Sequence, residues 1–393
     1  MSDATRGAGS ADHYRTYGSA TKAIHAGYRP DPATGVVNAP IYASSTFAQD
    51  GVGGLRSGFE YARTGNPTRA ALESSLAALE AASYARAFSS GMAATDCALR
   101  ALLRPGDHVV IPDDAYGGTF RLIDKVFTLW GVSYTAAALT DLDSVRASMT
   151  DQTKLIWLET PTNPLLSIAD IAAISTLAAE TKTKILVDNT FASPALQQPL
   201  SLGADIVLHS TTKYIGGHSD VVGGALLTND EALDEAFAFL QNGAGAVPGP
   251  FDAYLTMRGL KTLPLRMQRH SDNAAEVAEF LCGHRAISTV LYPGLSTHPN
   301  HKVAARQMSA FGGMVSVRLH GGPRAARDFC SSTAIFILAE SLGGVESLIE
   351  YPGAMTHAST AGSQLEVPDD LVRLSVGIED IADLLGDIEQ ALG

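Results

Sequence analysis

The sequence is poor in cysteine and has no long hydrophobic run. Its three cysteines among 393 residues, Cys97, Cys282 and Cys330, are odd in number and form no C-x-x-C pair. This spacing argues against a disulfide framework and a thiolate zinc site, and we expect three buried thiols that pack as small hydrophobic side chains. No run approaches the ~18 apolar residues of a membrane-spanning helix, and residues 1–20 lack the apolar stretch of a secretory leader. A cytoplasmic protein is therefore expected.

Positive charge is also scarce. Lys and Arg total 28 against 41 Asp and Glu, a formal net charge of −13. An acidic surface repels nucleic-acid phosphates and anionic lipids, and we find no local basic cluster, so neither nucleic acid nor a membrane is an expected partner. A hydrophobic fraction of 46% and a charged fraction of 18% are ordinary for a globular protein. What remains is an enzyme or a protein-binding module.

Sequence patterns divide the chain into four segments. Residues 1–20 are rich in Gly, Ser, Ala and Asp, which predicts a mobile tail. Residues 21–66 contain many turn residues and little helical periodicity, as in an arm that lies on another surface. Residues 67–258 alternate short apolar runs with helical patterns, and residues 259–393 have the pattern of a smaller α+β domain. We expect a large domain followed by a small one.

The segment 67–258 has the pattern of an α/β domain. Short apolar runs are candidate strands at 86–88, 108–111, 132–134, 155–158, 185–187, 206–208 and 225–227. Helical patterns lie between them at 70–80, 92–103, 119–130 and 168–180. Continuously apolar strands that alternate with helices predict a mostly parallel sheet covered on both faces. The ligand site of such a sheet lies at the carboxyl ends of its strands.

The last part of the chain begins with a long helical pattern. Residues 251–281 have helical periodicity that Pro264 is expected to break. Strand-like runs follow at 314–319 and 371–376, and a helical pattern at 380–392 ends the chain. These elements predict the small C-terminal α+β domain.

One strand of the predicted sheet leads to a lysine. The apolar run 206–208 is followed by the hydroxyl-rich residues 209–212 and then by Lys213. This order places an amine at the carboxyl end of a buried strand, where it can form a Schiff base if its surroundings favour the neutral amine. A surface lysine that simply follows a strand is the alternative.

A carboxylate and an anion site accompany this lysine. The strand at 185–187 ends in Asp188, which can pair with a protonated pyridine nitrogen; a turn residue or helix cap is the alternative. Near Ser90 and Gly91 a strand runs into a helix through small residues, and the free N–H groups of such a turn suit a phosphate, although tight turns of this kind are common. Pyridoxal phosphate requires all three of these features: a lysine amine, a partner for its pyridine nitrogen and a site for its phosphate.

Four other residues have more than one interpretation. Tyr116 follows the strand at 108–111 and either stacks on a cofactor ring or covers the core as a loop tyrosine. Arg373 lies among apolar residues and needs a carboxylate partner, which is a substrate or a structural Asp or Glu. His209 and His218 lack metal-ligand spacing, so we expect structural roles for them and no metal site.

These motifs together resemble the Cys/Met-metabolism family of pyridoxal-phosphate enzymes, from about Thr21 to the C-terminus. The resemblance rests on YARTGNPTR at 61–69, SGMAA at 90–94, ETPTNP at 159–164, VDNT at 187–190, HSTTKY at 209–214, SLGGVESL at 341–348 and RLSVGIE at 373–379. It implies the fold type I of PLP-dependent transferases, with a large cofactor-binding domain at 67–258 and a small C-terminal domain at 259–393.

The resemblance implies roles for the candidate residues. Lys213 is the Schiff-base lysine and, with Tyr116, a catalytic residue, and Asp188 is the partner of the pyridine nitrogen. The cofactor phosphate would be held by the amides of Gly91 and Met92 and by the hydroxyls of Ser210 and Thr212. Tyr116 would stack on the cofactor ring, and Asn163 would contact its hydroxyl side. Arg373 and Ser341 would bind the substrate α-carboxylate. Asn163 also belongs to the implied substrate site.

The resemblance also implies a shared active site. In the family, Tyr61 and Arg63 reach the cofactor phosphate of the neighbouring subunit, which implies a homotetramer built from two dimers. Glu60 and Glu340 match positions that face the distal amino group of cystathionine in members that make or cleave it at Cγ, and paired carboxylates attract such an ammonium group. Methionine γ-lyases carry a cysteine where this chain has Gly118, which disfavours that alternative.

The activity implied by the resemblance is γ-replacement in methionine biosynthesis. O-succinyl-L-homoserine, or O-acetyl-L-homoserine, and L-cysteine would give L-cystathionine and the free acid, with Lys213 as the base that removes the α-proton and later a β-proton. The alternative is γ-elimination of cystathionine to cysteine, ammonia and 2-oxobutanoate, which the residues named here do not distinguish. A more distant alternative uses sulfide in place of cysteine, and a non-catalytic scaffold is the alternative from another class.

Overall fold

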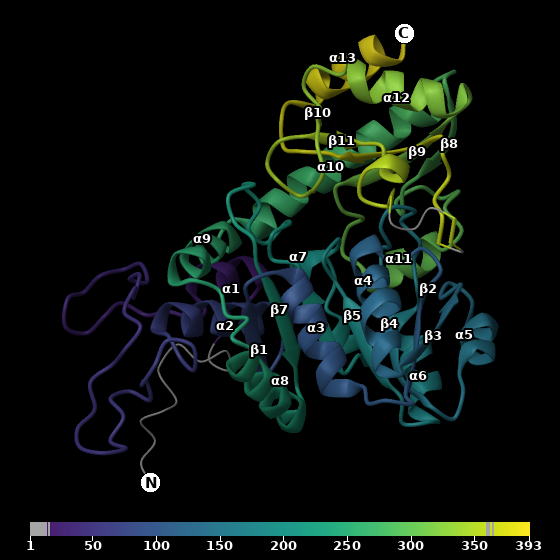
Figure 1. The fold of residues 1–393 in the computed structure, drawn as a ribbon. Helices are drawn as coiled ribbons and strands as arrows, with labels where there is room; N and C mark the ends of the chain where they lie inside the picture. Colours follow the sequence, from purple (N-terminus) through teal and green to yellow (C-terminus); the bar gives the residue numbers. More distant parts are fainter. Residues whose placement is uncertain (1–13, 15, 359–361, 364) are drawn as a thin grey trace. The chain divides into compact units, whose positions relative to one another are not determined.

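The computed structural model describes residues 14, 16–358, 362–363 and 365–393, so most of the predicted tail at 1–20 lies outside the described residues. The chain forms two compact units, whose elements are labelled in Figure 1. One unit comprises Met1–Ala101 and Asp205–Pro264, and the other comprises Leu102–Ala204 and Leu265–Gly393. These boundaries differ from those of the expected domains, which stay a prediction.

The first unit contains a three-stranded portion of sheet, in which β7 lies between β1 and β6. Its elements are α1 Ser19–His25, α2 Pro67–Glu80, β1 Tyr84–Phe88, α3 Gly91–Leu102, β6 Ile206–His209, β7 Gly224–Thr228, α8 Glu231–Ala244 and α9 Pro250–Leu260. Helix α2 begins where the Asn66 side chain accepts the N–H groups of Thr68 and Arg69. Pro67 occupies the first helical position, where its missing N–H is not needed.

The direction of β7 corrects one detail of the expected sheet. This strand is antiparallel to both β1 and β6, whereas its apolar run was expected among mostly parallel strands. Parallel neighbours need a crossover of a dozen or more residues, usually with a helix. The connection 210–223 contains no helix and returns at the same end of the strands, because His209 pairs with Ala225. The loop that carries Lys213 therefore lies at the carboxyl end of β6.

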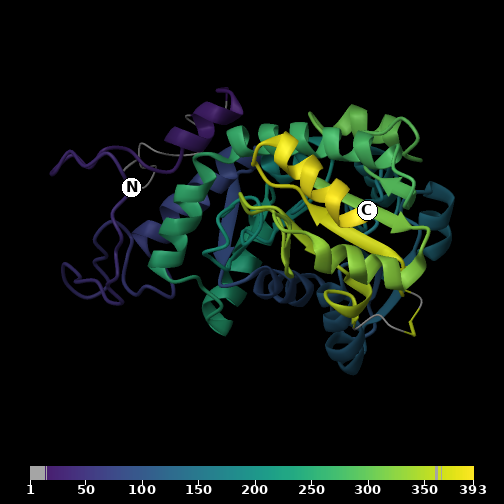
Figure 2. The same cartoon turned by 90° about the horizontal axis from the view of Figure 1, so that it is seen from above.

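Part of the N-terminal arm, residues 21–66, contacts helices α2 and α9 of its own unit, and the rest extends beyond them, as both ribbon views show in purple (Figures 1 and 2). Its start is helical, because α1 runs from Ser19 to His25, which corrects the expectation of little helix there. The Ser75 hydroxyl of α2 donates to the carbonyl of Ala26 at 2.7 Å. Gly27 has φ +91°, and a Cβ there would lie 2.2 Å from the Ala71 carbonyl oxygen, so glycine permits this close approach.

The second unit contains the parallel strands β5, β4, β2 and β3, which are neighbours in that order. This part of the unit consists of β2 His108–Pro112, α4 Gly117–Leu122, a π-helical turn Ile123–Phe127, a 3-10 turn Thr128–Trp130, β3 Ser133–Ala137, α5 Leu142–Ser148, β4 Thr153–Glu159, α6 Ile171–Ala179, β5 Lys184–Asp188, α7 Ser193–Leu196 and a 3-10 turn Pro199–Leu202. Every residue of β2 is buried, and β4 exposes only Lys154. Burial of consecutive residues confirms that both faces are covered. The helix expected at 119–130 is α-helical only to Leu122.

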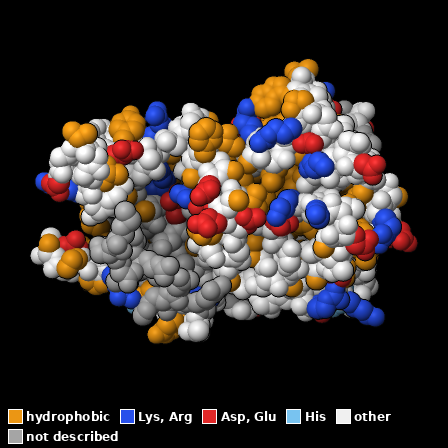
Figure 3. Space-filling model, turned by 90° about the horizontal axis from the view of Figure 1, so that it is seen from below, with side chains coloured by type: hydrophobic (Ala, Val, Ile, Leu, Met, Phe, Trp, Pro, Cys, Tyr) orange, Lys and Arg blue, Asp and Glu red, His pale blue; other side chains and the backbone are white. Residues whose placement is uncertain are grey.

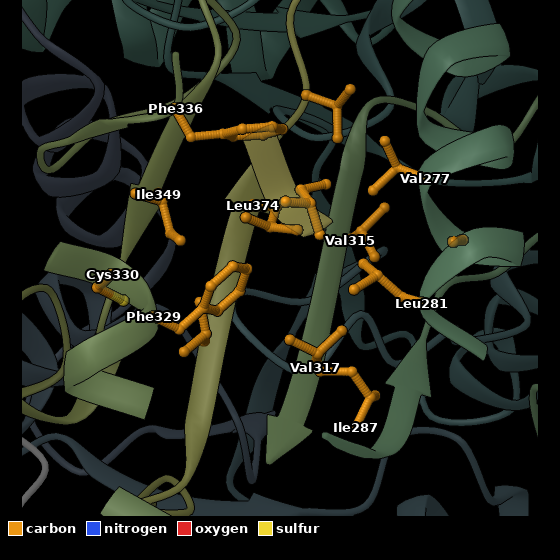
Figure 4. Packing of buried hydrophobic residues seen from close by; sticks show 14 of the residues in the cluster. Val277, Leu281, Ile287, Val315, Val317, Phe329, Cys330, Phe336, Ile349 and Leu374 are labelled. Atoms are coloured by element: carbon orange, nitrogen blue, oxygen red, sulfur yellow. The ribbon is translucent and has the colours of Figure 1, made fainter. Parts of the chain in front are cut away.

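The second sheet of this unit has the order β10-β11-β12-β9-β8. Its elements are α10 Leu263–Cys282, β8 Ile287–Leu291, α11 His301–Gln307, β9 Met314–Leu319, α12 Gly322–Ser332, β10 Ile337–Leu338, β11 Leu348–Glu350, a 3-10 turn Pro352–Ala354, β12 Leu371–Ser375 and α13 Ile381–Leu392. Only β10 and β11 pair in parallel. Figure 4 shows the core between sheet and helices, with Val277 and Leu281 of α10 facing Val315 of β9 and Phe329 of α12 near Leu374 of β12. Helix α13 packs on the same core (Figure 2).

The helical pattern at 251–281 forms two helices, but Pro264 does not separate them. Helix α9 ends at Leu260 and α10 begins at Leu263, so the break lies at Lys261 and Thr262. Pro264 stands in the first turn of α10, where a proline lacks no helical hydrogen bond. The expected break is therefore confirmed, and its position is corrected.

The three cysteine thiols differ in burial, whereas all three were expected to be buried. All three cysteines are free; Cys97 and Cys330 are buried, and burial raises the pKa of each thiol to about 12. Cys282, at the last position of α10, is exposed, so the expectation of a buried thiol is wrong there.

The surface carries mixed charge. On the face drawn in Figure 3, Lys and Arg side chains are interspersed with Asp and Glu. Within the part of the chain that the structure describes, no helix is both long and apolar enough to cross a membrane. The same residues contain no group of three or more His, Cys, Asp or Glu side chains that could hold a metal ion.

Candidate functional site

The first unit brings Gly91, at the start of α3, against Ser210, which follows β6. A Cβ atom at Gly91 would lie 2.9 Å from the Cβ of Ser210, which is too close for two carbon atoms, so glycine permits this close approach. The hydroxyl of Ser90 accepts the N–H of Ala93 at 3.0 Å and caps the helix. The N–H groups of Gly91 and Met92 belong to the first turn, where an α-helix provides them no partner. Together with the helix dipole, they form a cradle for an anion.

The loop after β6 carries Thr212 and Lys213, two further predicted cofactor contacts of the first unit. Thr212 donates its hydroxyl to the carbonyl of Gly223 (3.2 Å) and accepts the N–H of Gly223 (3.1 Å). The predicted contact of Thr212 with a phosphate would therefore replace part of this pair. The backbone N–H of Lys213 donates to the carbonyl of Ser210 (3.3 Å), and its carbonyl accepts the N–H of Gly217 (2.8 Å). A compact turn thus presents Lys213 next to the cradle residue Ser210.

The arm carries Glu60, Tyr61 and Arg63, and all three side chains are exposed. The guanidinium of Arg63 lies 5.5 Å from the centre of the Tyr61 ring, and its Nε donates to Asn242 Oδ1 at 3.2 Å. Arg63 thus connects Tyr61 of the arm to Asn242 of α8. The predicted contact of Tyr61 and Arg63 with a neighbouring subunit stays a prediction.

The two histidines beside the Lys213 loop have structural contacts. His209 Nε2 lies 2.5 Å from Glu80 Oε1, and both side chains are buried. His218 Nδ1 donates to the carbonyl of Gly216 at 2.8 Å. The first contact ties the end of β6 to the end of α2, and the second closes a local turn.

The second unit brings Tyr116 and Asn163 together through a shared partner. Strand β4 ends at Glu159, which pairs in register with Asp188, the last residue of β5. Glu159 Oε2 accepts the N–H of Tyr116 (2.9 Å), and its Oε1 accepts the N–H of Asn163 (2.8 Å). Two predicted cofactor contacts are thus held by one carboxyl group, beside the predicted partner of the pyridine nitrogen.

Burial and neighbouring charges shift the pKa values of this group. Burial raises the pKa of Glu159 well above its ordinary value, and the charge of Asp188 raises it further. Burial also raises the pKa of the Tyr116 phenol; the charge of Arg121 opposes this shift, and the charges of Glu159, Glu340 and Asp188 add to it. The contribution of Glu340 shows that this exposed carboxylate lies near Tyr116. The acidic groups around Tyr116 therefore favour its protonated form.

Arg373 occupies the middle of β12 with its side chain only 2% exposed. Its Nη1 donates to Asn163 Oδ1 (2.7 Å) and lies 2.9 Å from Glu350 Oε1, and its Nη2 donates to the carbonyl of Ser341 (2.7 Å). Glu350 is 1% exposed and faces Arg373 in the register of β11 and β12. A structural carboxylate thus answers the open question about the partner of Arg373.

His357 completes this network. Its Nε2 donates to the carbonyl of Asn163 (3.0 Å), and its ring meets Tyr116 edge-on at 6.5 Å between centroids. Burial, with a contribution from Arg373, lowers the pKa of His357 to about 4, so the imidazole is neutral at pH 7. Thr356 donates its hydroxyl to Glu350 Oε1 at 2.8 Å. The side chains around Arg373 are therefore fixed before any ligand binds.

Three residues of this network were given no role from the sequence. Glu159 lies in the motif ETPTNP, and a charged residue at the end of a buried apolar strand was a usable signal. Glu350 also ends an apolar strand, but its pairing with Arg373 depends on strand register. His357 follows no periodic pattern, and nothing in its local sequence indicated a contact with Asn163.

Helix α10 supports the strand that carries Arg373 and provides a pH-dependent contact. His270 is fully buried, and its Nδ1 donates to the carbonyl of Val376 at 2.7 Å. Burial lowers the pKa of His270 from 6.5 to about 4. Between these values the unfolded chain binds a proton that the folded chain does not, so stability is lost as the pH falls from about 6.5 toward 4.

We expect His270→Asn to reduce this pH dependence. The amide keeps a donor toward Val376 but does not titrate, so the free energy of unfolding should fall less steeply with acid, by about 1 kcal/mol per pH unit. Urea unfolding of both proteins at pH 7, 6 and 5 measures the difference. Parallel pH profiles of the two proteins would contradict the assignment of this titration to His270.

Comparisons with known proteins find similarity over nearly the whole chain. The family described as "Cys/Met metabolism PLP-dependent enzyme" matches residues 20–393. The chain is 80% identical, over 381 residues, to the cystathionine gamma-synthase of Mycobacterium tuberculosis (strain H37Rv), covering 97% of this chain and 98% of that protein. It resembles the solved structure of metB from Corynebacterium glutamicum with a TM-score of 0.95 and 63% identity, covering 96% of this chain and 98% of that one. The cystathionine gamma synthase of Xanthomonas oryzae pv. oryzae, solved in complex with cystathionine, has a TM-score of 0.93 and 46% identity, covering 95% and 97% of the two chains.

The match includes every motif on which the resemblance rests. All of them lie between Tyr61 and Glu379, within the matched residues. The parallel strands of the second unit and its helix-covered second sheet have the architecture of fold type I, and the similarity to solved structures extends over nearly the whole chain. This chain belongs to the family of Cys/Met metabolism PLP-dependent enzymes.

Proposed function

We propose that the chain catalyses γ-replacement in methionine biosynthesis, joining O-succinyl-L-homoserine or O-acetyl-L-homoserine and L-cysteine to give L-cystathionine and the free acid. The observation that carries this proposal is the 80% identity, over 381 residues, to a protein named cystathionine gamma-synthase. The similarity to a synthase solved with bound cystathionine supports the same product. A C–S bond forms at Cγ of the homoserine ester as its C–O bond breaks, so the cysteine sulfur replaces the acyloxy group.

Pyridoxal phosphate, the cofactor of the family, fits the residues present. The close approach of Gly91 and Ser210, which a Cβ at position 91 would prevent, brings the first turn of α3 next to the Ser210 hydroxyl, as a shared phosphate site requires. The amides of Gly91 and Met92 and the Ser210 hydroxyl would hold the phosphate, and Asp188 would pair with the ring nitrogen. Tyr116 would stack on the ring, and Asn163 and Thr212 are the remaining proposed contacts.

When bound, pyridoxal phosphate supplies an electron sink for negative charge on the substrate. Lys213 would bind the cofactor covalently and, once released as a neutral amine, accept the α-proton and later a β-proton. Its place in a turn directly after β6 suits a base that must move between these positions. Tyr116, whose phenol is kept protonated by burial, would position the ring and not act as an anion at pH 7.

Arg373 would bind the substrate α-carboxylate, with Ser341 and Asn163 beside it. The carboxylate would share the guanidinium with Glu350, which already faces it. Because the side-chain contacts of Arg373 hold its planar group in place, little conformational entropy is lost when the substrate binds. Glu60 and Glu340 are both exposed, as expected for groups that attract the distal ammonium group of cystathionine from solvent.

We further propose that the protein is a homotetramer of two dimers with shared active sites. The arm supports this, because it carries exposed apolar side chains at Val37, Ile41, Val52 and Leu55. Exposed apolar groups of this kind mark a surface that another chain covers. Tyr61 and Arg63 would then reach the cofactor phosphate of the neighbouring subunit.

A substrate comparison tests the proposed reaction. We expect faster formation of cystathionine from O-succinyl-L-homoserine plus L-cysteine than cleavage of L-cystathionine alone, when initial rates are measured on one preparation. Parallel assays with O-acetyl-L-homoserine and with sulfide in place of cysteine identify the acyl group and the nucleophile. Faster cleavage than synthesis would favour γ-elimination, and a preference for sulfide would favour the more distant alternative.

A further inference from the structure

Glu159 joins two loops that carry proposed cofactor contacts. It is the last residue of β4 and is 5% exposed. One carboxyl oxygen accepts the N–H of Tyr116, and the other accepts the N–H of Asn163. Tyr116 follows β2, whereas Asn163 follows β4, so this single side chain sets the separation of two segments that are 47 positions apart in the chain.

The geometry requires a carboxyl group and not merely a side chain of this size. Two backbone donors point at two different oxygens, at 2.9 and 2.8 Å. Glutamine has the same shape but offers one acceptor oxygen, so its NH₂ group would face one of the N–H donors. Such a buried N–H without an acceptor loses its hydrogen bond and is not compensated by water.

The surroundings of Glu159 connect these contacts to the proposed reaction. Asp188 lies beside it in the register of β4 and β5. Asn163 also accepts Nη1 of Arg373 with its side chain and Nε2 of His357 with its carbonyl. A displacement of Asn163 would therefore also displace the guanidinium of Arg373, the proposed binding group of the substrate α-carboxylate.

We propose that Glu159 is a positioning residue of the active site, whose carboxyl group holds Tyr116 and Asn163 in place next to Asp188. The inference rests on the proposed function for the roles of these three neighbours. It predicts that the loss of either hydrogen bond changes the absorbance of the bound cofactor, because Tyr116 or Asn163 would then lie at a different distance from the ring.

Asp114 provides a matched control in the same loops. This buried carboxyl group accepts the hydroxyls of Thr162 (2.5 Å) and Ser167 (2.8 Å), both through Oδ2. It thus connects the same two segments as Glu159, but it does so through the hydroxyls of Thr162 and Ser167 and not through the N–H groups of Tyr116 and Asn163. An amide at position 114 keeps the acceptor oxygen that both hydroxyls need.

The experiment compares Glu159→Gln, Glu159→Ala and Asp114→Asn with the unchanged holoenzyme. We expect Glu159→Gln to change the visible absorbance of bound pyridoxal phosphate and to lower kcat about tenfold, with smaller changes in KM. Glu159→Ala should enlarge both effects, and Asp114→Asn should leave the spectrum unchanged and kcat within about twofold. Near-UV circular dichroism and thermal melting establish that each variant is folded.

Two outcomes would overturn the inference. One is an unchanged spectrum and kcat in Glu159→Gln, and the other is an equal spectral change in Asp114→Asn, which would indicate a general effect of loop packing. The spectrum is recorded without amino-acid substrates, so it tests the role of Glu159 even if the substrate assay assigns another reaction. Failure of the proposed function would instead appear as slow cystathionine synthesis by the unchanged protein, with the spectral results intact.

Discussion

Lys213→Ala is expected to lower kcat for cystathionine synthesis by at least about 10⁴-fold, the upper range for a positioned proton-transfer group. The change removes the amine that would accept the α-proton and later a β-proton, and it also removes the proposed covalent attachment of the cofactor. The backbone contacts of the turn remain, because alanine keeps the N–H that donates to the carbonyl of Ser210 and the carbonyl that accepts the N–H of Gly217. The variant should therefore fold normally.

Initial rates and circular dichroism measure this result. Lys154→Ala is the matched control, because Lys154 is the exposed lysine of β4, and its rate should stay within about twofold of that of the unchanged enzyme. Borohydride reduction followed by peptide mapping should place the cofactor label at Lys213 in the unchanged protein. Near-normal turnover by Lys213→Ala, or a label elsewhere, would refute the assignment, and a protein that binds no cofactor would favour the scaffold alternative.

The same variant also tests the shared active site. Lys213→Ala and Arg63→Ala should each be nearly inactive alone, since one loses the proposed base and the other a proposed phosphate contact. If Arg63 serves the neighbouring subunit, refolded mixtures contain sites that combine an intact Lys213 with an intact Arg63, and activity returns. No recovery in a mixture with proven subunit exchange would contradict the sharing of sites.

Arg373→Met is expected to have the second largest effect, on both stability and activity. The change leaves Glu350 as a buried carboxylate that has lost its cationic partner, which costs about 3–5 kcal/mol of unfolding free energy. It also removes the proposed binding group of the substrate α-carboxylate, so kcat/KM should fall about 100-fold or more. One substitution thus combines a structural and a functional loss.

A double variant separates these two losses. In Arg373→Met/Glu350→Leu, apolar side chains replace the whole buried pair, and most of the lost stability should return, because such replacements are often neutral or stabilising. Activity should not return, since no group remains for the carboxylate. Urea unfolding and kcat/KM for O-succinyl-L-homoserine measure the two quantities. Recovery of activity together with stability would show that Arg373 has a structural role only.

The extent of successful prediction differs between local and distant features. The apolar run 155–158 predicted β4 because a strand buried on both faces needs consecutive apolar residues, and the structure confirms it. The need of Arg373 for a carboxylate partner was also predicted, because a buried guanidinium without one is costly. The identity of that partner was not predicted, because 41 acidic residues could supply it and only the register of β11 and β12 selects Glu350.

Errors in the prediction have the same origin. The run 225–227 was correctly identified as a strand, but the sequence of a strand is similar whether its neighbours are parallel or antiparallel. Its direction follows from the connection 210–223, which forms the Lys213 loop and no crossover helix.

By itself, the sequence determined the family, the cofactor, the positions of the main strands and the lysine that follows β6. These features depend on short segments, in which residue type and spacing reflect a local chemical requirement. The tertiary structure decided which side chains share hydrogen bonds: Glu159 with Tyr116 and Asn163, and Arg373 with Glu350. The physical reason is that these contacts depend on strand register and loop closure, which bring together groups far apart in the chain and which no local pattern encodes.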